Sequence, residues 1–331
     1  MKIKIVGIAF YHPEKVVTND YYIRHFEKRG KNVKHLLEDI YGREKRYLIA
    51  NKKGGKCENS LTMQIEATKK VLKDCKISGK EIDGIIITSQ INEYIAPPNA
   101  AFIHEAINGG DSCLCYDLNV NCGGMVEAFQ QAAFYMEHYS NMRNILIVCG
   151  DYINPIINKE NELLYGIFSD SACAVLVTST KEESMILETQ HYMHNQVNEF
   201  MVYPKCGMSN IFSSKKKDIQ AVQYEKGQCD LNIIAYKIKE MVKKNNLTLE
   251  QITAFCFTQL SKKNMEKLCE ELGVPFSKCP YIGEKYGYTL SSSPFLALDS
   301  WIQEGKVNRG DYILFWAIGS GIQHIMMLIK Y

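Results

Sequence analysis

Two repeating patterns of apolar positions alternate along the first 180 residues of the chain. In residues 61–75, Leu61, Ile65, Val71 and Leu72 follow the 3.6-residue spacing of a helix. Short runs rich in Val and Ile, which are typical of strands, occupy residues 3–10, 82–90, 112–120 and 144–152. The run at 82–90 is apolar without alternation, which predicts a strand buried on both faces. A further helix is predicted directly after Cys122.

The second half of the chain repeats this alternation. We interpret residues 172–179 and 185–192 as an antiparallel strand pair joined by a charged turn. The later elements are predicted as helices at 231–246, 262–274 and 291–305, a strand at 252–259, and a closing strand pair around 319–321. Strands that alternate with helices predict βαβ units and largely parallel sheets. Because both halves end in a strand pair, we predict a duplicated α/β architecture with halves at 1–180 and 181–331.

Composition narrows the range of partners. The chain has 331 residues, of which 46% are hydrophobic and 23% charged, and its net charge is +2. This near balance favours neither a nucleic acid nor a membrane as partner. The basic run Lys215–Lys217 is interpreted as a solvated surface, and the alternative is a contact for phosphate or for an acidic carrier protein. The N-terminus lacks the apolar core of a signal peptide, and no apolar run reaches the ~18 residues of a membrane span.

The twelve cysteines are scattered through the chain and do not suggest a disulfide framework. Together with the absence of a secretory signal, they predict reduced thiols in a cytoplasmic protein. No metal site is expected, because the chain contains no C-x-x-C pair. The nearest spacing is Cys113-x-Cys115, whose side chains are expected to point to opposite faces of a strand.

Cys122 is the candidate for nucleophilic chemistry. It lies between a predicted strand and a predicted helix and is followed by Gly123 and Gly124, which are expected to leave space for a substrate. The free N–H groups and the partial positive charge of a helix N-terminus are expected to lower the pKa of the thiol and to serve a developing oxyanion. The alternative is an inert buried cysteine, the common state of a free thiol in a protein core.

The residues around Cys122 resemble a sequence motif of a known family. YDLNVNCGGMVEAF is similar to the nucleophile region of the thiolase superfamily, and most closely to that of ketoacyl-acyl carrier protein synthase III. Further segments match the same family in order and spacing: GIAFYHPEKVVTND, YGREKRYLI, IIITSQINEYIAPPNAAFIHEAI, GIFSDSACAVLV and AIGSGIQHIMMLI. The resemblance therefore runs over almost the whole chain.

The resemblance implies a thiolase-like fold, in which two similar α/β halves are stacked as αβαβα layers. It implies that Cys122 accepts an acyl group from coenzyme A or an acyl carrier protein, with no permanently bound cofactor. The backbone N–H of Gly319 would join that of Cys122 in an oxyanion hole. The enzyme would be a homodimer, with a heterodimer containing an active homologue as the alternative.

Two positions depart from the family pattern. By the resemblance, Thr258 stands where the family has its catalytic histidine, and Tyr288 where it has its catalytic asparagine. Neither side chain can carry the charge of an imidazole or act as a base near neutral pH. Asp170 matches an aspartate of the family hairpin and is interpreted as a structural turn residue.

Other histidines are candidates to replace the missing catalytic base. His324 follows Gly319 on the closing strand, and the alternative is that it is a structural histidine of the core or of an interface. His191 and His194 are weaker candidates near the end of a mid-chain strand, and His104 is expected near a dimer interface.

Two functions therefore stay open. The first is an acyltransferase that forms a thioester on Cys122 without efficient decarboxylation of a malonyl donor. The second is a degenerate subunit that supports an active homologue. The sequence does not determine the length of the acyl chain, the acceptor or the pathway.

Overall fold

The fold is taken from a computed structural model, which describes residues 1–50, 57–193, 201–215, 219, 222–223 and 230–331. His194, Lys216 and Lys217 lie outside the described residues. Within the described part of the chain, no helix is both long and apolar enough to cross a membrane.

A five-stranded sheet forms the first half. Its strands, in spatial order, are β1 (Ile3–Tyr11), β7 (Ser171–Ser179), β6 (Asn144–Asp151), β4 (Gly84–Ile87) and β5 (Leu114–Asp117). The central strand β4 runs parallel to both of its neighbours and is fully buried, as its continuous apolar run predicts. β7 is antiparallel to β1 and β6.

A four-stranded sheet forms the second half. Its order is β11 (Ile252–Phe257), β12 (Tyr312–Gly319), β13 (Gln323–Lys330) and β8 (Met185–Met193). Only β11 and β12 are parallel in this sheet, and the β12–β13 pair is the predicted antiparallel closing pair.

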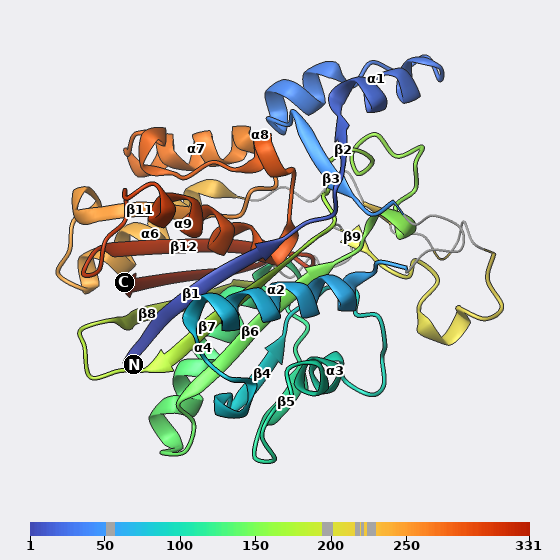
Figure 1. The fold of residues 1–331 in the computed structure, drawn as a ribbon. Coiled ribbons are helices and arrows are strands. Elements are labelled where there is room, and N and C mark those ends of the chain that lie inside the picture. Colours follow the sequence, from blue (N-terminus) through green and yellow to red (C-terminus); the bar gives the residue numbers. More distant parts are fainter. Residues whose placement is uncertain (51–56, 194–200, 216–218, 220–221, 224–229) are drawn as a thin grey trace.

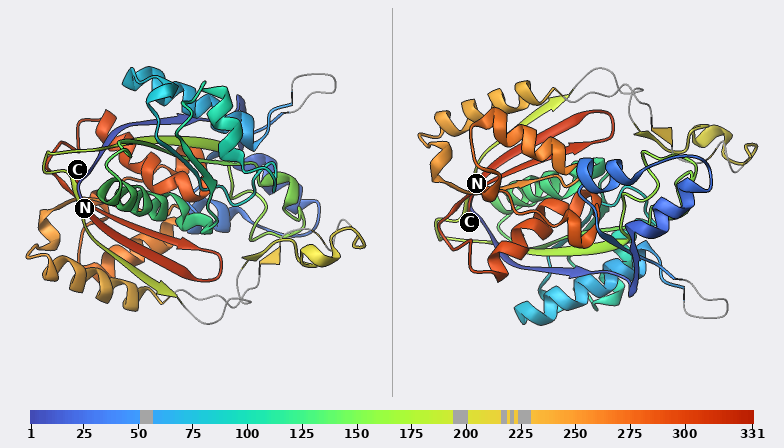
Figure 2. Two further views of the ribbon diagram at one scale, coloured as in Figure 1. Left: turned by 90° about the horizontal axis from the view of Figure 1, so that it is seen from below. Right: turned by 90° about the horizontal axis from the view of Figure 1, so that it is seen from above.

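Helices cover both faces of each sheet and complete five layers. One outer layer holds α2 (Ser60–Cys75) and α3 (Asn99–Ala106), which pack on the first sheet. The central layer holds α4 (Gly124–His138) and α9 (Ser293–Gln303), whose apolar side chains share one core with both sheets. The other outer layer holds α6 (Leu231–Lys244) and α7 (Lys262–Leu272) against the second sheet. This αβαβα stacking is seen in Figures 1 and 2 and confirms the expected fold class.

Local capping explains where several helices begin and end. The side chain of Asn59 accepts a hydrogen bond from the Thr62 backbone N–H (2.9 Å), and the Thr62 hydroxyl oxygen accepts one from the Asn59 N–H (2.8 Å). These bonds satisfy N–H groups that the first turn of α2 leaves free. Ser261 caps α7 in a similar way, and α7 ends at Gly273, whose φ of 78° suits glycine. The helix predicted at 262–274 is therefore confirmed, with its last helical residue at Leu272.

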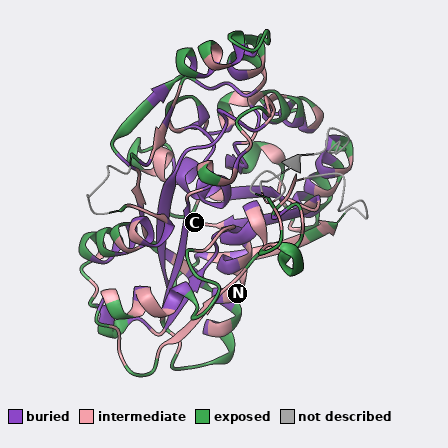
Figure 3. Cartoon of the chain, turned by 90° about the vertical axis from the view of Figure 1, so that its right-hand side faces the viewer, coloured by how far each residue is buried: buried purple, intermediate pink, exposed green. Residues whose placement is uncertain are grey.

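The remaining elements form the connections and a cap beside the carboxyl ends of β4, β5 and β11. The cap contains β2 (Lys15–Thr18), α1 (Asn19–Glu27), the short helix η1 (Leu36–Ile40) and β3 (Lys45–Leu48). Short helical turns lie at η2 (Gly79–Glu81), η3 (Asn121–Gly123), η4 (Asn154–Ile156), η6 (Met208–Asn210), η7 (Leu249–Gln251), η8 (Phe276–Lys278), α8 (Gly283–Tyr286) and η9 (Leu290–Ser292). A small pair consists of β9 (Met201–Val202) and β10 (Val222–Gln223). Buried residues concentrate in the central strands and helices, and the outer helices carry the exposed ones (Figure 3).

Three predictions about strands are wrong. β7 and β8 do not pair with each other but belong to different sheets, so the first half does not end in a strand pair. The sheets are mixed, not largely parallel, because among the described strands only the β4–β5, β4–β6 and β11–β12 pairings are parallel. Cys113 and Cys115 do not point apart: their sulfurs are 3.8 Å from each other, because residues i and i+2 of a strand share a face. The division of the chain into halves at 180 and 181 stays a prediction.

Candidate active site

Cys122 lies in the short turn η3, directly before α4 in the central layer. The residue before it, Asn121, has a φ of 49°, in the left-handed region that asparagine tolerates better than most residues. This sharp turn follows the segment after β5 and directs the cysteine side chain into the cluster beneath the cap. Only 7% of Cys122 is exposed.

The two glycines after Cys122 permit close packing of the turn. A Cβ atom on Gly123 would lie 2.9 Å from the Ile325 side chain. One on Gly124 would lie 2.8 Å from Thr88 Cβ and 2.9 Å from its carbonyl oxygen. The expectation that these glycines leave space for a substrate is therefore wrong here, because protein atoms already fill that space.

A small cavity adjoins the sulfur, and we call it the nucleophile cavity. It has a volume of about 30 Å³, roughly that of a single water molecule. Apart from Cys122 and Tyr288 it is lined by Leu164, Phe168, Met201, Leu260, Leu290, Ile318 and Ser320. Among the described residues that line the cavity, none carries an imidazole or carboxyl group, and most of them are apolar.

Thr258 and Tyr288 meet at this cavity from different parts of the second half. Thr258 follows β11, and its backbone N–H donates to the Trp316 carbonyl oxygen on β12 (2.8 Å). Its hydroxyl lies 3.0 Å from the Tyr288 hydroxyl, and both residues are buried. The Tyr288 hydroxyl also hydrogen-bonds the Cys122 sulfur. The structure thus brings together the three side chains that the sequence comparison selected.

Gly319, at the end of β12, packs directly against the turn that carries Cys122. A Cβ atom at this position would lie 2.9 Å from the Val120 carbonyl oxygen and 3.6 Å from the Cys122 backbone nitrogen. Only glycine fits without displacing that backbone. The backbones of Gly319 and Cys122 are therefore neighbours.

Gln90 is part of the site and was missed from the sequence. Its side-chain Nε2 donates to the Cys122 sulfur at 2.7 Å, and its backbone N–H donates to Asp151 Oδ1 at 2.8 Å. Gln90 follows β4, and Cys122 follows the neighbouring parallel strand β5. Loops after adjacent parallel strands meet at one edge of a sheet, and this rule was the available signal.

Burial raises the pKa of the Cys122 thiol to about 12. Hydrogen bonds from Tyr288 and Gln90 oppose this shift, and the nearby Asp151 carboxylate reinforces it. The expectation of a lowered pKa is therefore wrong for this buried thiol. The cost of burying a thiolate in an apolar cavity exceeds the stabilisation from the few donors that face it.

The candidate replacement bases lie elsewhere. His324 is buried, and its Nδ1 accepts a hydrogen bond from Trp316 Nε1 at 3.2 Å. Its ring also packs near Tyr192, so it belongs to the core of the second half. His191 Nε2 lies 2.7 Å from Glu127 Oε2, and that carboxylate raises the pKa of His191. Neither imidazole lines the nucleophile cavity.

Asp170 has the structural role expected of it. Its two carboxyl oxygens accept from the Ile49 backbone N–H (2.9 Å) and from Asn154 Nδ2 (2.7 Å). These bonds hold the start of β7 to the strand hairpin of the cap. Among the described residues, no group of three or more His, Cys, Asp or Glu side chains is arranged to hold a metal ion.

Comparison with known proteins shows which family models and which solved structures the chain matches. Residues 116–194 match the family model "3-Oxoacyl-[acyl-carrier-protein (ACP)] synthase III", and residues 242–331 match the model of its C-terminal part. The chain is 25% identical to a beta-ketoacyl-[acyl-carrier-protein] synthase III of Aquifex aeolicus, over 100% of both chains. It is 24% identical to the Clostridium perfringens protein of that name, over 99% and 98% of the two chains.

Solved structures have the same fold. The crystal structure of 3-oxoacyl-[acyl-carrier-protein] synthase III from Aquifex aeolicus matches 99% of this chain and 100% of its own, with a TM-score of 0.84 at 24% identity. A Xanthomonas campestris OleA structure with bound lauric acid and lauroyl-CoA matches 100% and 99% of the two chains, with a TM-score of 0.79 at 17% identity. These similarities establish a thiolase-like α/β fold.

Proposed function

The chain belongs to the 3-oxoacyl-[acyl-carrier-protein] synthase III family of the thiolase superfamily, and from this premise we propose that it is an acyltransferase that forms an acyl thioester on Cys122. The donor is an acyl-coenzyme A or an acyl carrier protein, and the acyl group then passes to an acceptor. The observation that supports the proposal most is the packing of Gly319 against the Cys122 turn, which leaves the Gly319 backbone beside the backbone of Cys122.

The loading step neither consumes nor releases a proton overall. The Cys122 sulfur attacks the thioester carbonyl carbon, the new carbon–sulfur bond forms, and the bond to the donor sulfur breaks. The proton of Cys122 leaves on the donor thiol, so the step is balanced without an imidazole. Gln90 Nε2 and the Tyr288 hydroxyl donate to the sulfur and favour developing negative charge on it. The N–H groups of Cys122 and Gly319 would stabilise the carbonyl oxygen.

Decarboxylation of a malonyl donor is proposed to be inefficient. That step forms an enolate, and in the family that the chain resembles a histidine and an asparagine stabilise this enolate. Here Thr258 and Tyr288 hold these positions, and their hydroxyls hydrogen-bond each other. One hydroxyl of such a pair is occupied as the acceptor of the other, and neither residue can supply a positive charge. Losing a general acid or base typically forfeits ~10²–10⁴ in rate.

The second candidate is a non-catalytic subunit that supports an active homologue. The small volume of the nucleophile cavity and the pKa of about 12 at Cys122 favour it, because both oppose the formation of a reactive thiolate. In either function we propose a dimer, with a homodimer for the acyltransferase and a heterodimer for the supporting subunit. No cofactor needs to be bound permanently for either.

Mass spectrometry of the intact protein separates these candidates. The protein is incubated with a series of acyl-coenzyme A and acyl-carrier-protein donors. We expect an adduct with the mass of the acyl group, which is absent from Cys122→Ala and retained in the matched variant Cys57→Ala, whose cysteine is exposed. Failure of every donor to leave an adduct on the wild-type protein would favour the supporting subunit. Release of carbon dioxide from a malonyl carrier protein at the rate of an active synthase would contradict the roles given to Thr258 and Tyr288.

A further inference from the structure

Asp151 is a buried carboxyl group that the proposed loading step does not use. It is the last residue of β6, and only 2% of it is exposed. Its Oδ1 accepts hydrogen bonds from the backbone N–H groups of Gln90 (2.8 Å) and Ile91 (3.4 Å). The same Gln90 donates through its side chain to the Cys122 sulfur at 2.7 Å. Asp151 is therefore linked to the nucleophile through a single residue.

The other oxygen of the Asp151 carboxyl group also has a fixed partner. The Cys149 thiol donates to Asp151 Oδ2 at 3.3 Å, and the Ser291 hydroxyl donates to the Cys149 sulfur at 3.1 Å. Cys149 and Ser291 are both buried. Because both oxygens are engaged, the carboxyl group has one orientation, and the Gln90 backbone meets an acceptor in a fixed place.

The loop that carries Gln90 is anchored a second time, one residue earlier. The Ser89 hydroxyl oxygen accepts hydrogen bonds from the Gly150 backbone N–H (2.9 Å) and from Gln64 Nε2 (2.8 Å). Ser89 and Gln64 are buried. A change at Asp151 therefore leaves this loop attached to β6 and to α2, and we expect its effect to be confined to Gln90 and its side chain.

The charge of Asp151 also acts on Cys122. Burial is the largest cause of the raised pKa of the Cys122 thiol, and the Asp151 carboxylate adds to it. Two negative charges in a buried region repel each other, so an ionised Asp151 disfavours a thiolate on Cys122. Burial raises the pKa of Asp151 itself to about 6, and its charge therefore changes between about pH 5 and pH 7.

The groups that face Asp151 do not cancel this charge. Ser171, its partner on β7, and Gln90, after β4, are uncharged. Burial raises the pKa of the thiols of Cys149 and Cys122, so both stay neutral while Asp151 titrates. Among the described residues, no lysine, arginine or histidine forms an ion pair with Asp151.

We propose that Asp151 is a positioning residue for Cys122, which holds the Gln90 amide on the sulfur and whose negative charge opposes a second negative charge there. The two effects have opposite signs. The Gln90 amide stabilises a thiolate, and the charge of Asp151 destabilises it. This role rests on the proposed function only in taking Cys122 as the nucleophile, and it does not depend on the acyl donor.

Two substitutions separate the position from the charge. Asp151→Asn keeps an acceptor oxygen for the Gln90 N–H and removes the charge. We expect Cys122 to react about threefold faster in this variant than in the wild type at pH 8, because a lower pKa increases the thiolate fraction more than it weakens the nucleophile. Asp151→Ala also removes the charge but offers no acceptor, so we expect it to react about threefold more slowly than Asp151→Asn. The rate is measured with methyl methanethiosulfonate and peptide mass spectrometry.

The pH profile of this reaction is a readout that a merely structural role would not change. In the wild-type protein, Asp151 becomes charged between about pH 5 and pH 7, so we expect the rate to rise by less than about tenfold per pH unit there. Asp151→Asn should show the full rise of about tenfold per pH unit over the same range.

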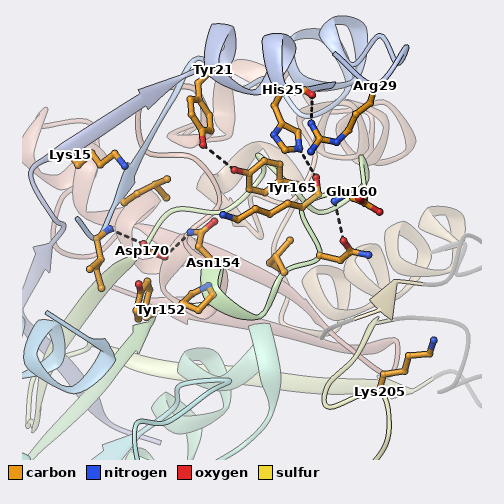
Figure 4. A pocket seen from close by; sticks show the side chains of 16 residues that line it. Lys15, Tyr21, His25, Arg29, Tyr152, Asn154, Glu160, Tyr165, Asp170 and Lys205 are labelled. Carbon is orange, nitrogen blue, oxygen red and sulfur yellow. Dashed lines mark hydrogen bonds between the residues drawn. The ribbon is translucent and has the colours of Figure 1, made fainter. Parts of the chain in front are cut away.

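Asp170→Asn is the matched control. Asp170 is also buried, and burial raises its pKa to about 7. Its oxygens accept from Ile49 and Asn154 instead of from the Gln90 loop, and it lines a separate cleft of about 1030 Å³ beside α1 (Figure 4). We expect this variant to keep the wild-type profile of Cys122. Circular dichroism and the unfolding midpoint check that the variants fold.

Two results would overturn the role of Asp151. One is a wild-type rate that rises by the same factor per pH unit from pH 5 to pH 8, and this measurement needs no variant. The other is an equal rate for Cys122 in the wild type and in Asp151→Asn. Because no acyl donor is used, a confirmed profile without any acyl adduct on Cys122 would refute the proposed acyltransferase and leave the role of Asp151 standing.

Discussion

Among the residues that the structure describes, hydrogen-bond donors lie beside the Cys122 sulfur, and no imidazole does. Gln90 and Tyr288 each donate to it, and the nucleophile cavity holds about the volume of one water molecule. A thiol in this position reacts as a thiolate only if the substrate itself brings polar groups into the cavity, or if the cavity opens. A favourable residue type at a helix start is therefore not enough to determine the protonation state of the thiol.

At the residue scale, the pH dependence of alkylation tests the burial of Cys122. With a pKa of about 12, above the ordinary value, the neutral thiol is favoured over the whole accessible range. We expect the alkylation rate of Cys122 to rise about tenfold per pH unit from pH 7 to pH 10, without a plateau. The rate is measured with iodoacetamide, followed by mass spectrometry of the peptide. A plateau below pH 9 would show that the thiolate is stabilised in the ligand-free protein.

Two glutamine variants test whether a hydrogen bond to the sulfur shapes this pH profile, one beside the sulfur and one at an exposed control position. Gln90→Leu removes one donor to the sulfur, and we expect alkylation at a given pH to slow by about tenfold, the value of one hydrogen bond to a charged group. Gln303→Leu, at the exposed end of α9, should leave the profile unchanged.

At the scale of elements, most single helices and strands follow from the apolar pattern, but their partners do not. α2, α7 and β6 lie where the spacing predicts them. The short connection between β7 and β8 suggests that they pair with each other, but β7 pairs with β1 and β6 and β8 pairs with β13, all of which are distant in the sequence. The helix α1, which belongs to the cap, has no counterpart among the predicted elements.

Replacing Gly124 tests the packing of α4. Alanine has a higher helix propensity than glycine, by about 1 kcal/mol, and would stabilise an isolated helix. In this fold its Cβ would lie within 2.9 Å of the Thr88 backbone, so we expect Gly124→Ala to lower the free energy of unfolding by about 1–3 kcal/mol. Urea unfolding measures the change, with Glu137→Ala at an exposed position of α4 as the control. An unchanged or raised stability of Gly124→Ala would contradict the close packing.

At the scale of the whole molecule, β5 leaves one edge of the first sheet unpaired. Among the described strands it has a neighbour on one side only, and all of its residues are half-buried. The backbone N–H groups of Leu114 and Leu118 donate toward β4, at 2.9 and 2.7 Å. By alternation along the strand, the N–H of Cys115 points to the free edge. An edge of this kind invites pairing with a second chain.

We expect light scattering to give twice the chain mass of 37.8 kDa for the wild-type protein. Cys115→Pro removes only the outward N–H and should yield monomers, because proline cannot donate to a new strand. Cys115→Ala keeps that N–H and should remain dimeric. A monomeric wild-type protein, or a dimeric Cys115→Pro variant, would place the interface elsewhere or exclude it.

The sequence by itself predicted most element positions, because periodicity is a local property of a chain, and its resemblance to a known family indicated the fold class and the four positions Cys122, Thr258, Tyr288 and Gly319. The tertiary structure alone decided that Gln90 reaches the sulfur, that the glycines of the turn are filled by neighbours, and that the thiol is held neutral. Each of these depends on distances between segments far apart in the sequence. Burial in particular is set by every surrounding element at once, and no local pattern reports it.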